Sequence, residues 1–166
     1  MIFQYSQINK TTEVLNDLVK INNDRIAGYQ LALNQSTKID SDLEDAFNKI
    51  IYEGICYKQQ LIEKIKQLDG DIKNGVNIQG KIYKAWMDLK ITFAGSTQKA
   101  IIASWLFNEE IAFNAYRAAL SENTGITGEL YQLIAEQKEE LKKNFDMIKN
   151  YHDARHIIDY SLMYFS

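Results

Sequence analysis

Glu109 is the residue whose type and position most favour chemistry in this sequence. On a helical wheel of about 100° per residue, it falls in the middle of an apolar stripe on the segment 97–121. The stripe consists of Ile102, Trp105, Leu106, Phe113, Tyr116 and Leu120. A buried, unpaired carboxylate is costly, and it acquires a raised pKa, a polar partner or a metal. The pattern therefore predicts a polar site within an apolar interior.

Asn22 occupies the matching place in the first half of the chain. The segment that starts at Asn22 resembles the segment that starts at Glu109, and this repeat also aligns Tyr29 with Tyr116. Asn22 is the centre of its own apolar stripe, made by Leu15, Leu18, Val19, Ile26, Tyr29 and Leu33. Each half therefore places one polar group at mid-length of its helix, facing inward.

Polar side chains on the remaining helical segments can reach the same level. Gln137 and Asn144 lie within the apolar stripe of the last segment, and Lys58 lies near the inward face of the second. Tyrosine hydroxyls need hydrogen-bond partners when they are buried. We therefore predict a buried polar network of Asn22, Tyr29, Lys58, Glu109, Tyr116 and Gln137.

Helical periodicity marks the elements that must position these residues. The long segments cover about 11–33, 41–68, 97–121 and 128–151, and a short amphipathic helix is expected at 81–93. Ser41 opens an S-x-x-E capping box before the second long helix, and Gly70 is the expected left-handed stop after it. Gly95 and Ser96 are expected to end the short helix and cap the next one.

The lengths of the connections predict how the helices pair. Short loops join the first long helix to the second and the third to the fourth, which makes each pair antiparallel. One long connection, which carries the short helix, joins the second to the third, so these two run parallel. The prediction is an all-α, ferritin-like four-helix bundle with a helix-containing crossover between helices 2 and 3.

Length and composition fit a single domain over residues 1–166. The chain is 46% hydrophobic, has no proline and carries a net charge of −3, which favours a packed helical core over a disordered chain. The 19 Lys and Arg residues are well mixed with the 22 Asp and Glu residues, so we expect no nucleic-acid partner.

The sequence also indicates a compartment. A single cysteine, Cys56, fits a reducing environment. The first residues do not resemble a secretory signal, and no apolar stretch approaches the roughly 20 residues that span a bilayer. We therefore expect a cytoplasmic protein that does not associate with a membrane.

Three stretches of the chain resemble a known bacterial family, the domain of unknown function 2383. They are the LNDL-x₃-NND segment at 15–24, the WMDLK segment at 86–90 with Ala85 before it, and Glu109 through Leu120. The resemblance covers about 11–154. It implies a ferritin-like bundle that is often linked to stress responses, in a family whose biochemical activity is not established.

The wider ferritin-like class implies a di-metal site, in which two helices each give a Glu and the other two each give a Glu-x-x-His. By that resemblance Glu109 occupies the ligand position on helix 3, while the helix 1 position holds Asn22. Glu53 and Glu140 are the candidates on helices 2 and 4. The two histidines, His152 and His156, lie at or beyond the end of helix 4. They are four positions apart and could bind a metal if the helix continues, but a surface pair without further ligands is usually incidental.

The two readings of this site lead to two functions. In the first, the core is a metal-free polar network and the protein is a non-enzymatic, stress-associated bundle that acts through self-association or an unidentified protein partner. In the second, it is an iron- or manganese-binding oxidase or iron-handling protein with a degenerate site. The apolar tails, 2–5 and 157–165, either pack on the bundle ends or form an interface.

Overall fold

The structure is a computed structural model of the chain. It describes residues 1–35, 39–73, 80–90 and 97–165, with the backbone alone at 35, 156–160 and 165. The described residues contain no strand. In chain order the helices are α1 (Ile2–Gln35), α2 (Ser41–Gln67), α3 (Lys81–Leu89), α4 (Gln98–Ala119), the 3₁₀ turn η1 (Glu122–Thr124) and α5 (Gly128–Phe165).

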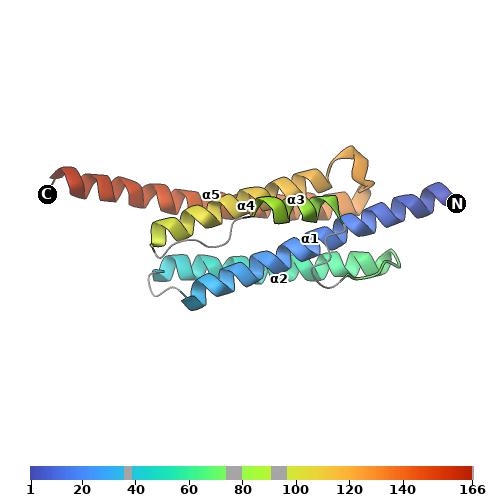
Figure 1. Ribbon diagram of the computed structural model, residues 1–166, viewed down its shortest axis with the longest axis horizontal. Coiled ribbons are helices and arrows are strands. Elements are labelled where there is room, and N and C mark those ends of the chain that lie inside the picture. The colour runs from blue at the N-terminus through green and yellow to red at the C-terminus, as the bar shows by residue number, and fades with distance from the viewer. Residues whose placement is uncertain (36–38, 74–79, 91–96, 166) are drawn as a thin grey trace.

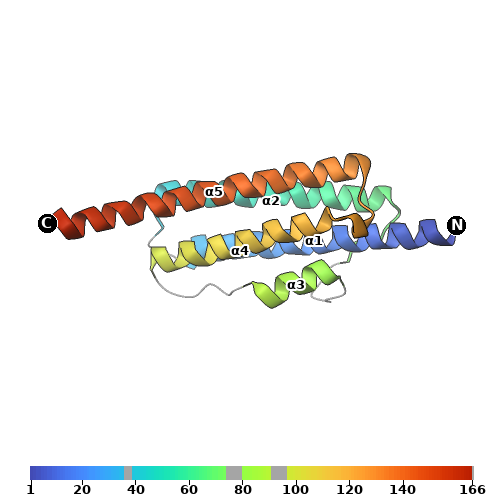
Figure 2. The same cartoon turned by 90° about the horizontal axis from the view of Figure 1, so that it is seen from above.

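Four long helices, α1, α2, α4 and α5, lie side by side along one axis (Figures 1 and 2). α1 and α2 are antiparallel, α4 and α5 are antiparallel, and α2 and α4 run in the same direction, as the loop lengths predict (Figure 1). The short helix α3 belongs to the long connection between α2 and α4. It lies outside the four, packed against α1 and α4 (Figure 2).

The first and the last helix in the sequence are longer than the sequence pattern predicts. α1 begins at Ile2 rather than near Thr11, and α5 continues to Phe165 rather than ending near Tyr151. Neither added stretch contains a glycine or a proline, so no residue in them forces a helix to end. The tails are therefore helical arms. The N-terminal arm is residues 1–10, and the C-terminal arm is residues 155–165.

Three predicted details of the helix ends are wrong. The N-cap of α2 is Asp40 rather than Ser41, because the Asp40 side chain accepts a hydrogen bond from the backbone N–H of Leu43. After α2, the left-handed residue is Asp69, at φ 53°, rather than Gly70. The short helix ends at Leu89 instead of Phe93. The expected boundary at Gly95 and Ser96 lies outside the described residues.

The apolar core is divided along the long axis into two clusters. One contains Leu18, Leu61 and Trp86, and the other contains Tyr29, Phe47 and Trp105. Buried polar residues lie near the junction of the two clusters: Asn22, Arg25 and Glu109, with Gln137 on α5. The polar layer is thus enclosed on both sides by close-packed apolar side chains.

The internal repeat extends to the helix starts. Asn22 and Glu109 are 87 positions apart, and so are Ser41 at the start of α2 and Gly128 at the start of α5. With the same offset, the start of α4 at Gln98 falls on residue 11 of α1. The two arms therefore lie outside the repeated part of the chain.

Candidate functional site

The centre of the polar layer is an ion pair between α1 and α4. Nε and Nη2 of Arg25 each donate a hydrogen bond of 2.8 Å to one carboxylate oxygen of Glu109. Both residues are buried, with exposed fractions of 3% for Arg25 and 1% for Glu109. Burial alone would lower the pKa of the Arg25 guanidinium, but the charge and hydrogen bonds of Glu109 outweigh burial and raise it. Arg25 therefore keeps its positive charge in the interior, where Glu109 binds it through two hydrogen bonds.

A chain of hydrogen bonds leads from this pair through all four long helices. Nη1 of Arg25 donates to Oδ1 of Asn22 at 3.0 Å, and Nδ2 of Asn22 donates to the hydroxyl of Tyr116 at 2.7 Å. That hydroxyl donates to Oε1 of Gln137 at 2.9 Å, and Nε2 of Gln137 donates to Oε1 of Gln60 on α2 at 2.9 Å. Because a guanidinium can only donate, Arg25 fixes the direction of every bond that follows.

Tyr29 lies in the layer but differs from its repeat partner Tyr116. Its ring stacks on Trp105 with ring centroids 4.4 Å apart, and its hydroxyl is fully buried without a well-formed hydrogen bond to any described residue. Burial, and next the charge of Glu109, raise the pKa of Tyr29 well above its usual value. Burial likewise raises the pKa of Tyr116, to about 12. Both side chains are therefore neutral phenols.

The remaining predicted network residue, Lys58, is half-buried on α2 and takes part in none of these hydrogen bonds. A second polar contact between α2 and α5 lies one level away. Nδ2 of Asn144 donates to Glu53 at 2.6 Å, and Lys49 donates to Oδ1 of Asn144 at 3.2 Å and pairs with Glu53 at 2.7 Å. Asn144 therefore joins the two helices through a partly exposed ion pair.

The proposed ligand positions do not fit a metal centre. Both oxygens of Glu109 are held by a guanidinium, which is itself a cation and cannot ligate. Glu53 is engaged by Lys49 and Asn144, and Glu140 pairs with Lys143 on the surface of α5. Among the described residues no three His, Cys, Asp or Glu side chains come together as a metal would require. A cation is already present here, as part of the protein.

The other candidate residues lie outside the layer. Cys56 is half-buried on α2. The ring of His152 lies 3.5 Å from the carboxylate of Asp153 within α5, not beyond the helix end. The side chain of His156 is outside the described part of the structure.

α1 also holds the crossover in place, through two acidic residues seven positions apart. The first, Asp17, is buried and accepts a hydrogen bond of 3.1 Å from the backbone N–H of Tyr83 in the first turn of α3. It supplies a cap that the N-cap residue Gly80 cannot, because glycine has no side chain. A Cβ at Gly80 would lie 1.9 Å from the Asp17 carboxylate, so this contact requires glycine.

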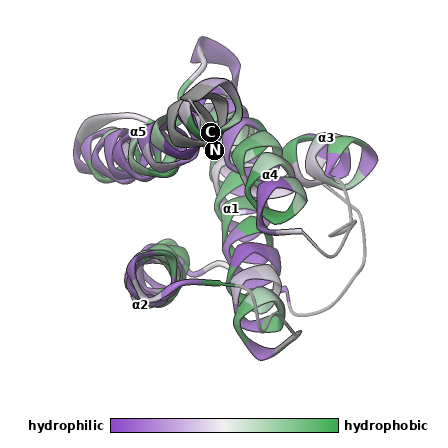
Figure 3. Cartoon of the chain, turned by 90° about the vertical axis from the view of Figure 1, so that its left-hand side faces the viewer, coloured by the Kyte–Doolittle hydropathy of each residue, from purple (hydrophilic) through white to green (hydrophobic). Residues whose placement is uncertain are grey.

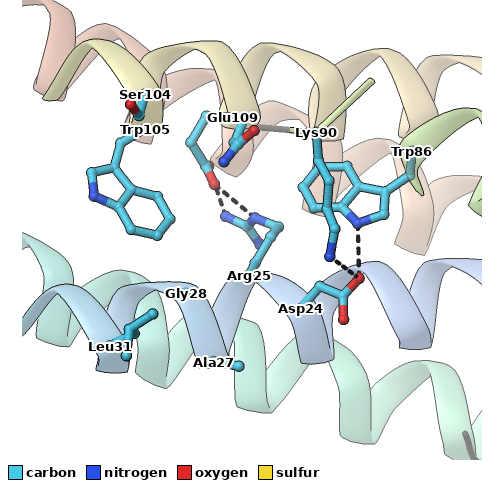
Figure 4. A pocket seen from close by; sticks show the side chains of 11 residues that line it. Asp24, Arg25, Ala27, Gly28, Leu31, Trp86, Lys90, Ser104, Trp105 and Glu109 are labelled. Carbon is cyan, nitrogen blue, oxygen red and sulfur yellow. Dashed lines mark hydrogen bonds and ion pairs between the residues drawn. The ribbon is translucent and has the colours of Figure 1, made fainter. Parts of the chain in front are cut away.

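The second acidic residue, Asp24, binds the other end of α3. Its Oδ2 accepts from the indole N–H of Trp86 at 2.9 Å, from Lys90 at 3.2 Å and from the Tyr83 hydroxyl at 3.2 Å. Figure 4 shows Trp86 and Lys90 converging on this carboxylate. Nearby, Asn16 donates to the carbonyl of Asp71 and accepts from the N–H of Lys73. The first helix thus fixes the path of the long connection.

Comparison with known families bears directly on these contacts. The model of the family described as Domain of unknown function (DUF2383) matches residues 10–123. The chain belongs to this family. The DUF2383 match includes Asp17, Asp24 and Trp86, which join α1 to α3, and both members of the ion pair. It stops before α5, which supplies Gln137.

The DUF2383 assignment names no activity, and no curated protein matches the chain. Within the described residues, no helix has both the length and the apolar character that crossing a membrane needs.

Arg25 is the residue of the site that the sequence analysis missed. The inward stripe predicted for this helix includes Asn22, Ile26 and Tyr29 but not Arg25. Arg25 lies three residues after Asn22, on the same side of the helix. An arginine within one turn of an inward Asn22, in a fold with an inward Glu109, is the signal that could have identified it.

Proposed function

We propose that this protein is a non-enzymatic, stress-associated, ferritin-like four-helix bundle that acts through contacts between protein chains, with a metal-free polar core. The observation that carries the metal-free part is the Arg25–Glu109 pair. In a ferritin-like frame the central carboxylates face metal ions. Here the guanidinium supplies the positive charge in the chain itself.

The parallel course of α2 and α4 and the long helix-bearing connection between them support the ferritin-like frame. The stress association rests on the family alone. The alternative, an iron- or manganese-handling oxidase, requires ligands that would have to displace Arg25 from Glu109. No feature of the described residues favours that exchange.

The two arms support a role in contacts between chains. Phe3 is 93% exposed in the N-terminal arm, and Met163 is 83% exposed in the C-terminal arm. The arms project beyond the packed helices at opposite ends of the molecule (Figures 1 and 2). Apolar side chains gathered in this way are typical of an interface.

The position of the arms favours head-to-tail association. Seen along the long axis, the N and C ends of the chain lie at nearly the same place (Figure 3). Copies placed end to end would bring the C-terminal arm of one beside the N-terminal arm of the next. An interface of this kind joins two different surfaces and can continue from copy to copy.

The metal-free part is tested by elemental analysis. The protein is purified from medium supplemented with iron and manganese, and its metal content is compared with that of Glu109→Ala. We expect no stoichiometric metal in either protein. Stoichiometric iron or manganese in the wild type that is lost in Glu109→Ala would overturn this part.

The contact part is tested by light scattering of charged variants. We expect the wild type to associate at high concentration, and Phe3→Glu and Met163→Glu each to abolish association. Tyr52→Glu, at an exposed tyrosine of α2, is the matched control and should behave like the wild type. Phe3→Glu retains an intact C-terminal arm and Met163→Glu retains an intact N-terminal arm. A mixture of the two variants should therefore form heterodimers through these two arms. A wild type that stays monomeric would contradict the proposal.

A further inference from the structure

A pocket of about 260 Å³ lies between α1, α3 and α4, beside the buried ion pair. Cavities of about 150 Å³ already admit a benzene molecule, so this one has room for a substituted ring. Arg25 and Glu109 lie between the indoles of Trp105 and Trp86 (Figure 4). Exposed Ala27 and Leu31 lie at its edge.

The walls of the pocket suit a flat ring. Both tryptophans of the chain line it. Gly28 contributes no side chain, and a Cβ there would lie 2.6 Å from Cη2 of Trp105. The absence of that atom leaves the indole edge against the helix backbone and keeps this wall thin. Planar aromatic surfaces favour aromatic ligands in offset or edge-to-face contact.

The floor of the pocket offers directional hydrogen bonds. A guanidinium has five N–H groups, and the bonds of Arg25 to Glu109 and Asn22 use three of them. One N–H on each terminal nitrogen has no acceptor among the described residues. Each carboxylate oxygen of Glu109 accepts one bond from Arg25, which leaves acceptor capacity for both the neighbouring Tyr29 hydroxyl and a ligand N–H. The floor can therefore donate to a carbonyl oxygen and accept from an amide N–H.

The charges of the lining cancel. Arg25 pairs with Glu109 on the floor, and Lys90 pairs with Asp24 at 3.2 Å near the rim. A charged ligand would lose water and find no opposite charge left unpaired, which is costly in a partly buried site. The lining therefore favours an uncharged ligand.

From these contacts we propose that the pocket binds an uncharged planar aromatic molecule that carries a carboxamide or a similar carbonyl group. Its ring lies between the indoles, its carbonyl oxygen accepts from Arg25, and its N–H donates to Glu109. This inference does not depend on the arms or on self-association. It adds a ligand to a protein whose proposed role is contact between chains.

The test uses benzamide as the probe and the indole N–H signals of Trp86 and Trp105 in a ¹⁵N–¹H correlation spectrum as the readout. Because the chain has two tryptophans and both line the pocket, every indole signal reports on the site. We expect saturable shifts of both signals with a dissociation constant of about 1 mM, a typical affinity for so small a ligand. Benzoate, which is nearly the same shape but charged, should bind about tenfold more weakly.

Two variants locate the binding. Ser104→Leu fills the pocket from α4, where the Ser104 hydroxyl donates to the carbonyl of Ala100 in its own helix. Ala27→Phe blocks it from the exposed side and should not disturb folding. Both should abolish the shifts, while Ser121→Leu and Ala118→Phe, at exposed positions elsewhere on or after α4, should bind as the wild type does. Absence of saturable shifts in the wild type, or unchanged binding in Ala27→Phe, would overturn the proposal.

Discussion

Arg25 and Glu109 join the two halves of the chain through a pair of parallel hydrogen bonds, each 2.8 Å long, at the centre of the molecule. The pair lies where the two apolar clusters meet, and Asn22, Tyr116 and Gln137 take their hydrogen-bond directions from it. Bidentate pairs of this kind combine strength with a fixed geometry. The orientation of the polar layer therefore depends on one guanidinium.

Breaking the ion pair from one side should be strongly destabilising. Arg25→Met leaves the Glu109 carboxylate buried without its partner, and we expect a loss of about 3–5 kcal/mol of unfolding free energy. The double variant Arg25→Met/Glu109→Leu removes both charges and should recover much of that loss, because apolar pairs of similar volume often replace buried ion pairs without cost. Urea titration of the three proteins measures both effects.

A surface pair provides the control for that experiment. Lys49 is about half exposed and pairs with Glu53 at 2.7 Å, so Lys49→Met should cost no more than about 1 kcal/mol. If Arg25→Met costs as little as Lys49→Met, the central pair does not organise the polar layer.

The two repeat-related tyrosines should respond differently to loss of the hydroxyl. Tyr116→Phe leaves an amide of Asn22 and a carbonyl of Gln137 without their partner, and we expect a cost of about 1–3 kcal/mol. Tyr29→Phe removes a buried hydroxyl that has no well-formed hydrogen bond to a described residue, so it should be neutral or slightly stabilising. Thermal and urea unfolding of the matched pair decide the point. Equal losses would contradict the assigned hydrogen bonds.

Asp17 should make stability fall as pH rises through the weakly acidic range. Burial raises its pKa from 3.8 to about 6. Between these values the folded protein holds the proton that the unfolded chain has released, so unfolding free energy decreases with rising pH. The decrease is complete above about pH 6 and amounts to about 2–3 kcal/mol. Below about pH 4 both states are protonated and the effect vanishes.

Asp17→Asn should remove this part of the pH dependence. The amide carbonyl can still accept from the N–H of Tyr83, but it carries no charge to be desolvated. We expect a flatter profile of unfolding free energy against pH and a variant at least as stable as the wild type at neutral pH. Asp45→Asn, on the exposed face of α2, should leave the profile unchanged. If unfolding free energy still decreases with rising pH in Asp17→Asn, the pH dependence arises from other groups.

Gly80→Ala should loosen α3. The new Cβ would lie 1.9 Å from a carboxylate oxygen of Asp17, so either the side chain or the start of the helix must move. We expect a loss of about 1–3 kcal/mol of unfolding free energy. We also expect faster hydrogen exchange of the Trp86 indole N–H, because the position of α3 determines its hydrogen bond to Asp24. Lys81→Ala, one residue further on and exposed, is the control. Unchanged exchange in Gly80→Ala would show that α3 does not depend on this cap.

The helices and their connections were predictable because each depends on local signals. Apolar spacing identified all four long helices, and the polar stretch after Asn34 and the long connection after Gly70 separated them. The helix ends were predicted less well. Residues 2–10 continue α1 because nothing ends it there, and Asp40 rather than Ser41 caps α2 because its side chain is the one that reaches Leu43 N–H.

The candidate site was predictable only in part because its contacts join residues far apart in sequence. The stripe pointed to Asn22 and Glu109, but the partner of Glu109 lies 84 positions away. Long, charged side chains are expected at the surface, which is why Arg25 was overlooked. The same applies to Asp17 and Asp24, whose roles follow from the position of α3 and from no local pattern.

The repeat and the ion pair together make the two hairpins complementary but not interchangeable. A dimer of two α1–α2 hairpins would enclose two guanidiniums and no carboxylate, and a dimer of two α4–α5 hairpins would enclose two carboxylates and no guanidinium. Either product leaves like charges facing each other in an apolar interior. The two halves of the repeat therefore differ at the centre of the polar layer. Because one carries the guanidinium and the other the carboxylate, each hairpin pairs favourably with the other kind of hairpin during folding.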